Sequence, residues 1–95
     1  MKSSATVPTA HAGRYMVQLC KHFGHKVPAE WNDHEGKITF EMGEAALRAA
    51  PETLMMVARA GDPESLSRLE KVMDSHLKRF AFREPEMAVA WRRGA

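Results

Sequence analysis

The sequence lacks many of the features that mark secreted, membrane-spanning or disulfide-stabilised proteins. It contains a single cysteine, Cys20, which excludes an intrachain disulfide framework and makes a reducing compartment the simpler expectation. The N-terminus has no apolar run of signal-peptide length, and no stretch approaches the roughly 18 apolar residues of a membrane span. We therefore expect a soluble cytoplasmic protein with no part in the membrane.

Motifs of common catalytic and binding sites are also missing. The chain has no HExxH sequence, no paired CxxC, no glycine-rich phosphate loop and no serine in a nucleophile elbow. It has no internal repeat, and no run of aromatic residues interleaved with basic ones, as many nucleic-acid-binding surfaces have. These absences weigh against catalysis and nucleic-acid binding, and they leave only a weak signal for a metal site.

What is present suits one globular domain with an uneven charge distribution. The chain has 95 residues, of which 44% are hydrophobic and 27% charged, and its net charge is +2. Residues 1–28 carry four lysine and arginine residues and no acid, whereas residues 29–64 carry eight acids against three bases. Residues 76–95 are again basic. If the two ends meet in the fold, they form one positive surface that attracts an anion or an acidic partner.

Two stretches have the 3.6-residue periodicity of amphipathic helices. The first covers residues 10–23, and Gly24 is placed to end it in the left-handed conformation. The second follows Asp62, a good N-cap, with Pro63 at the first helical position. Its buried stripe is expected to comprise Leu66, Leu69, Met73, His76, Leu77 and Phe80.

Alternation of apolar and polar residues predicts strands between and after these helices. It occurs in residues 38–42, after a turn-rich segment, and again in residues 45–49 and 54–58, although the composition of these two also suits helix. Residues 87–91 indicate a final strand. Residues 1–8 are small and polar and are expected to form a flexible tail.

The predicted order of elements is helix, three or four strands, helix, strand, which indicates an α+β fold. We expect a two-layer sandwich in which two helices pack on one face of a small, mainly antiparallel sheet, because this arrangement buries both apolar stripes together. Residues 9–95 would form this single domain, after the flexible tail of residues 1–8.

The segment LCKHFGHK, residues 19–26, concentrates one thiol, two imidazoles and two ammonium groups. One interpretation is a basic rim that binds an anion, since arginine can hold a carboxylate or phosphate with two parallel hydrogen bonds. The candidate residues for this rim are Arg14, His22, His25, His76, Arg79 and Arg83. A basic rim made of these residues requires the ends of the two helices to lie close together. Alternatively, these residues form an ordinary solvated basic face.

A second interpretation is an iron or zinc site with His22, His25, His76 and also Cys20 as candidate ligands. A third is a small thiol enzyme in which Cys20 is the nucleophile and His22 its base. Positions 20 and 22 lie about 200° apart around a helix, which argues against direct cooperation of these two side chains. Alternatively, Cys20 packs as a small hydrophobic residue, and His76 is a core histidine bonded to a backbone carbonyl.

The stretches HAGRYMVQLCKHFGHK near the start and HLKRFAFREPEMAVAW near the end, with GKITFEMGEAAL between them, resemble the bacterial domain-of-unknown-function family 2218. The resemblance covers about Val7 to Trp91. Some longer relatives join this domain to siderophore-interacting flavin reductases, so the resemblance implies iron or siderophore handling and such a reductase as a partner. It implies no catalytic residue. We therefore expect a small non-enzymatic binding or accessory module without a resident cofactor, which binds an anionic ligand or an acidic partner.

Overall fold

Two helices and six strands make up the computed structural model, which describes residues 1–94. In chain order they are β1 (Lys2–Pro8), α1 (Ala12–Gly24), β2 (Ala29–Trp31), β3 (Glu35–Thr39), β4 (Gly43–Ala49), β5 (Thr53–Ala60), α2 (Pro63–Phe80) and β6 (Arg92–Gly94). The sheet has the strand order β2-β3-β4-β5-β1-β6, and every neighbouring pair is antiparallel. The predicted α+β class and antiparallel sheet are confirmed.

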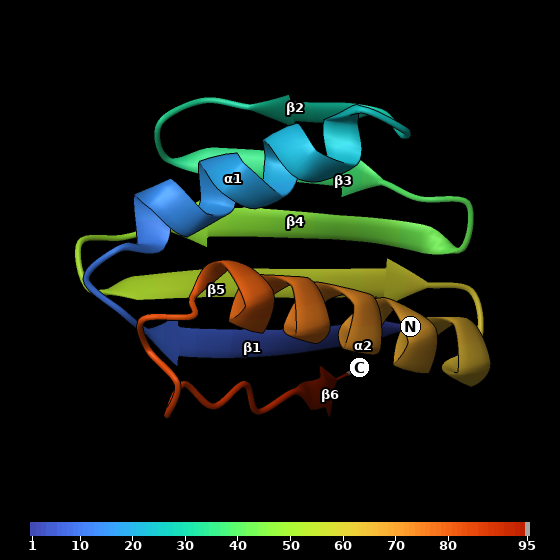
Figure 1. Cartoon of the computed structure of the whole chain (residues 1–95). Coiled ribbons are helices and arrows are strands. Elements are labelled where there is room, and N and C mark those ends of the chain that lie inside the picture. The colour runs from blue at the N-terminus through green and yellow to red at the C-terminus, as the bar shows by residue number, and fades with distance from the viewer. Residues whose placement is uncertain (95) are drawn as a thin grey trace.

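Both helices lie on the same face of the sheet, α1 over β2, β3 and β4, and α2 mainly over β5, with further contacts to β4 and β1 (Figure 1). Alternate strand residues point toward them and are buried, among them Val7, Ile38, Leu47, Leu54 and Met56. They meet the helix residues Met16, Leu19, Leu69, Met73 and Leu77 in one core. Full burial of such a side chain contributes about 1.5–3 kcal/mol. Within residues 1–94, no element covers the opposite face of the sheet.

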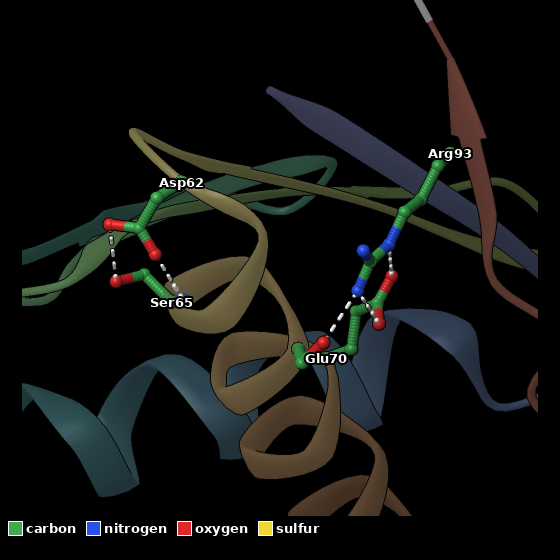
Figure 2. A network of polar contacts seen from close by, with 5 residues as sticks. Asp62, Ser65, Glu70 and Arg93 are labelled. Carbon is green, nitrogen blue, oxygen red and sulfur yellow. Dashed lines mark hydrogen bonds and ion pairs between the residues drawn. The ribbon is translucent and has the colours of Figure 1, made fainter.

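The start of α2 follows the sequence prediction closely. The Asp62 carboxylate accepts a hydrogen bond from the Ser65 amide at 2.7 Å and a second from the Ser65 hydroxyl at 3.2 Å (Figure 2). Pro63 has no amide hydrogen to satisfy, and Glu64 places a negative charge at the positive end of the helix. The predicted N-cap is therefore confirmed.

The end of α1 differs from the prediction. Gly24 is the last residue of the helix and has a negative φ, since Gly43 is the only residue with positive φ in the described part of the chain. The amides of Lys26 and Val27 both bond the carbonyl of Phe23. The prediction of a left-handed glycine end is therefore wrong, because this turn closes with right-handed backbone before Pro28 stops it.

The prediction of a flexible tail over residues 1–8 is also wrong. These residues form β1, which pairs with β5 from Lys2 opposite Arg59 to Pro8 opposite Thr53. On its other side β1 pairs with β6. Its inward side chains are small, so their alternation is weak in the sequence although they are buried below α2. A strand with few large apolar residues is stabilised here by two neighbouring strands.

The final strand lies further along the chain than predicted. Residues 87–91 have no regular structure, although Met87, Val89 and Trp91 pack against the core. The strand is β6, and Arg93 ties it to α2 by donating to Ser67 at 2.7 Å and to Glu70 at 3.2 Å (Figure 2). The two ends of the chain meet in the β1–β6 pair, as the hypothesis of one positive surface requires.

The strands between the helices are close to those predicted. Residues 45–49 and 54–58 lie in β4 and β5. The strand expected over residues 38–42 is shifted, because β3 ends at Thr39 and the chain then turns into β4. Gly43 is needed at this turn, since a Cβ there would collide with the carbonyl of Arg59. Neither helix of the described chain has the length and apolar character needed to cross a membrane.

Candidate functional site

A cleft of about 540 Å³ opens between α1 and the segment that follows α2. It is lined by His11, Arg14, Tyr15, Gln18, Phe80, Phe82, Arg83 and Glu84. The geometry of α1 places Arg14 and Gln18 one turn apart, so both side chains reach the same side of the cleft. Two larger hollows, of about 790 and about 630 Å³, are more open to solvent. This cleft is distinguished by two guanidinium groups beside aromatic rings.

The far wall of the cleft is held in place by Glu84. Its carboxylate accepts a hydrogen bond from the hydroxyl of Thr9 at 2.9 Å and another from the hydroxyl of Tyr15. The bond from Tyr15 is the main reason that the pKa of Glu84 lies below its usual range. Burial, together with this bond, raises the pKa of Tyr15. Glu84 is therefore an ionised acceptor that fixes the segment after α2 against α1.

The exposed ring of Phe82 forms the outer part of the same wall. Phe82 is 71% exposed, which is unusual for so large an apolar side chain. The guanidinium of Arg83 lies 5.6 Å from the centre of its ring, within the range of a cation–π contact. Neither Arg14 nor Arg83 forms an ion pair within residues 1–94. Both charges are therefore available to a ligand.

A second cluster, of histidine and phenylalanine rings, joins α1 to α2. The centre of the His22 ring lies 5.1 Å from the centre of the His76 ring and 5.4 Å from that of the Phe80 ring. Nδ1 of His76 lies 2.7 Å from the carbonyl oxygen of Val72, one turn earlier in α2. Partial burial lowers the pKa of His22, and the nearby His76 and Arg79 lower it further. The cluster therefore disfavours a positive charge on His22.

The structure divides the six predicted binding residues into two adjoining groups. Arg14 and Arg83 line the cleft, whereas His22, His25, His76 and Arg79 gather where α1 meets α2. Phe80 connects the two groups, because its ring lines the cleft and also contacts His22. The helices thus bring these residues close together, but not onto a single continuous rim.

The candidate metal ligands are not assembled. Within residues 1–94, no group of three or more histidine, cysteine or acidic side chains is close enough to hold a metal ion. The thiol of Cys20 is fully buried and points toward β3, where a Cβ added at Gly36 would lie 2.7 Å from its sulfur. Burial raises the pKa of Cys20 to about 11. A buried thiol of this kind offers no thiolate as a nucleophile or metal ligand at neutral pH.

Sequence reasoning missed the aromatic and acidic part of the cleft. Tyr15 is 5% exposed and packs in the core, but its hydroxyl also reaches Glu84. Phe82 and Glu84 were not singled out. The available signal is the segment FAFRE, residues 80–84, which places two phenylalanines beside an arginine just beyond a helix end.

Comparisons with known proteins identify the family. A family model described as an uncharacterised protein conserved in bacteria (DUF2218) matches residues 4–92. The NMR structure of PA4090 from Pseudomonas aeruginosa is similar, with 35% sequence identity and a TM-score of 0.81, over 96% of this chain and 94% of that chain. No curated protein matches. The family resemblance of the sequence is confirmed, and the comparisons carry no statement of activity.

Proposed function

The chain belongs to the bacterial family DUF2218, and from this premise we propose that it is a small non-enzymatic binding module for an anionic ligand. The ligand would enter the cleft between α1 and the segment after α2. The observation that carries the proposal is that Arg14 and Arg83, which have no acidic partner in residues 1–94, line one cleft with Phe80 and Phe82.

The chemistry of the cleft favours an anion with an apolar or aromatic body. A guanidinium group can hold a carboxylate through two parallel hydrogen bonds. The phenyl rings would cover the body of such a ligand, and an exposed phenylalanine gains most when a ligand removes its surface from water. The ionised carboxylate of Glu84 also lines the cleft and offsets one of the two guanidinium charges, which leaves the cleft with a net positive charge.

A metal chelate that carries aromatic carboxylate or phenolate groups has the same chemistry. The iron or siderophore context implied by the family resemblance is therefore compatible with this cleft. An acidic segment of a partner protein, such as a siderophore-interacting reductase, would use the same two arginines. We favour a small aromatic anion over a protein segment because the cleft has a volume of about 540 Å³, which suits a small molecule.

Binding is favoured over catalysis by the state of the candidate catalytic groups. Glu84 has a pKa below its usual range and is held by Tyr15 and Thr9, which makes it a weak general base. Cys20 is buried with a raised pKa. His22 lies outside the cleft, among aromatic rings. The hydroxyl of Ser75 lies 3.4 Å from Nδ1 of His76, but this nitrogen also lies 2.7 Å from the carbonyl oxygen of Val72, so it carries a proton and is not a base for Ser75.

The proposal is tested by NMR titration of isotope-labelled protein with benzoate, 2,3-dihydroxybenzoate and inorganic phosphate. We expect both aromatic anions to shift the amide signals of residues 11–18 and 80–84, and phosphate to bind more weakly because it leaves the phenyl rings uncovered. Arg83→Ala should weaken binding of the aromatic anions by roughly 10-fold, the loss of one charge-assisted contact.

Arg68→Ala provides the matched control, because Arg68 is an exposed arginine of α2 that does not line the cleft. It should leave the affinity unchanged. If no anion shifts the cleft signals, or if Arg83→Ala and Arg68→Ala behave alike, the proposed site is wrong. If an acidic peptide binds at the cleft and the small anions do not, the partner-protein form of the proposal is favoured instead.

A further inference from the structure

The outer face of the sheet, opposite the helices, has a charge distribution that is complementary to itself. Toward one edge, the outward side chains of β2, β3 and β4 include Glu30, Glu35 and Glu44, against Lys37 and Arg48. Toward the other edge, the charged outward side chains of β5, β1 and β6 within residues 1–94 are all basic, namely Lys2, Arg59 and Arg92. One half of the face is therefore acidic relative to the other.

The middle of this face is less polar. Val57 and Met55 of β5 are half-buried, and Ala46 of β4 lies directly opposite Val57 in the register. The flanking β1 contributes the neutral residues Ser4 and Thr6. The face thus has a mildly apolar centre between two edges of opposite charge character, an arrangement that suits a second copy of the same surface.

We propose that two copies of the chain associate through these outer faces, related by a two-fold axis that runs along the strands between β4 and β5. This axis places β5 over β4 of the partner subunit and β6 over β2 of the partner subunit. Because Arg59 lies opposite Glu44 in the register, it faces Glu44 of the partner subunit. Within one chain Glu44 pairs with Lys37 through one carboxylate oxygen at 3.1 Å, which leaves its other oxygen for Arg59 across the axis. In the same way, Val57 faces Ala46 of the partner subunit.

Two directions are possible for the two-fold axis, along the strands or across them. The row of outward residues that crosses the sheet through Val57 decides between them. That row ends at Glu30 on β2 and at Arg92 on β6. The proposed axis sets Arg92 against Glu30 of the partner subunit. A two-fold axis along this row, across the strands, would instead set Arg92 against Arg92 and Glu30 against Glu30. Like charges in contact oppose association, so the charges favour the axis along the strands.

The size of the face indicates a weak dimer. The six strands are three to eight residues long, and with a rise of about 3.3 Å per residue and a spacing of about 4.8 Å they make a face of roughly 500 Å². Two such faces in contact bury on the order of 1,000 Å², which lies near the lower end of specific interfaces. We therefore expect a dimer that forms as the concentration rises from micromolar to millimolar and weakens with salt.

The test is sedimentation velocity with two charge-reversal variants, Arg59→Glu and Glu44→Arg. Each variant alone sets like charges against each other across the axis, and its self-association should weaken by roughly 10-fold or more. Mixing the two variants restores both contacts in a heterodimer, which should form as readily as the wild-type dimer. Interactions within one chain cannot produce this rescue. Arg68 lies in α2, on the side of the sheet that the helices cover. Arg68→Glu makes the same charge change as Arg59→Glu and should dimerise as the wild type does.

Circular dichroism and thermal unfolding would show that each variant is folded. A wild-type protein that stays monomeric up to millimolar concentration would overturn the proposal, as would two variants that fail to associate when mixed. A dimer unaffected by Arg59→Glu would place the interface elsewhere. A different protein that binds this face and leaves the chain monomeric would show that the face serves another partner.

Discussion

The hydroxyl of Tyr15, on α1, donates a hydrogen bond to the carboxylate of Glu84, 69 residues later in the chain. The bond connects α1 to the wall of the cleft. We expect Tyr15→Phe to lower the free energy of unfolding by about 1.5–3 kcal/mol, since a hydrogen bond to a charged group is lost while the carboxylate remains. Urea denaturation at neutral pH measures the change.

A double-mutant cycle separates this bond from other effects of the substitution. Glu84→Gln removes the charge, and in its background Tyr15→Phe should cost clearly less than it does in the wild type. If the two substitutions are additive, the bond contributes nothing to stability. The same variants should weaken binding of an aromatic anion, because the segment after α2 is then less firmly positioned.

The histidine cluster predicts a pH-dependent stability. Burial and neighbouring positive groups lower the pKa of His22, so the unfolded chain binds its proton more readily than the folded chain does. Stability should therefore be highest above the ordinary histidine pKa of about 6.5 and should fall as the pH drops below it. Thermal unfolding of wild type and His22→Gln between pH 7.5 and roughly 5 measures this loss.

The His22→Gln variant should lose less stability across this range than the wild type. His34→Gln is the matched control, since His34 lies in the exposed turn between β2 and β3, away from the cluster. It should follow the wild-type curve. Equal pH dependence in His22→Gln and wild type would show that the ring cluster does not disfavour the charged form.

The buried thiol gives a third prediction. Cys20 is fully buried and its pKa is raised to about 11, so a thiol reagent should react with the native protein only through opening of the structure. We expect reaction with dithionitrobenzoate to be slow at neutral pH and complete within the mixing time in urea. Fast reaction of the native protein would contradict the burial of Cys20 and revive the thiol-enzyme hypothesis.

The strongest helical pattern was predicted correctly from the sequence, whereas a strand with small inward side chains was missed. The stripe Leu66, Leu69, Met73 and Leu77 predicted α2, and the cap at Asp62 predicted its start to the residue. β1 was missed because its inward residues include only one larger apolar side chain, Val7, and its stability comes from strands far away in the sequence. Local propensity carries no information about such partners.

Contacts between residues far apart in the sequence also limit how much of the site could be predicted. Six basic residues could be proposed because charge is visible in any sequence, and the fold places two of them, Arg14 and Arg83, in one cleft. The role of Glu84 depends on a contact with Tyr15 that only the fold creates. Nδ1 of His76 bonds the backbone carbonyl of Val72, as the core-histidine alternative predicts, but the residue is only half-buried, since the stripe faces α1 at that point rather than the sheet.

The last strand gives a prediction about local rather than global stability. Arg93 ties β6 to Glu70 and Ser67 of α2, but its side chain is 45% exposed, so the contact contributes little to global unfolding. Arg93→Ala should therefore leave the urea midpoint nearly unchanged. It should instead speed amide hydrogen exchange in β6 and the facing part of β1, while β4 and β5 keep their protection. Arg68→Ala, at an exposed arginine of α2, should leave both unchanged. Equal exchange in β6 for all three proteins would show that the β1 pairing alone holds this strand.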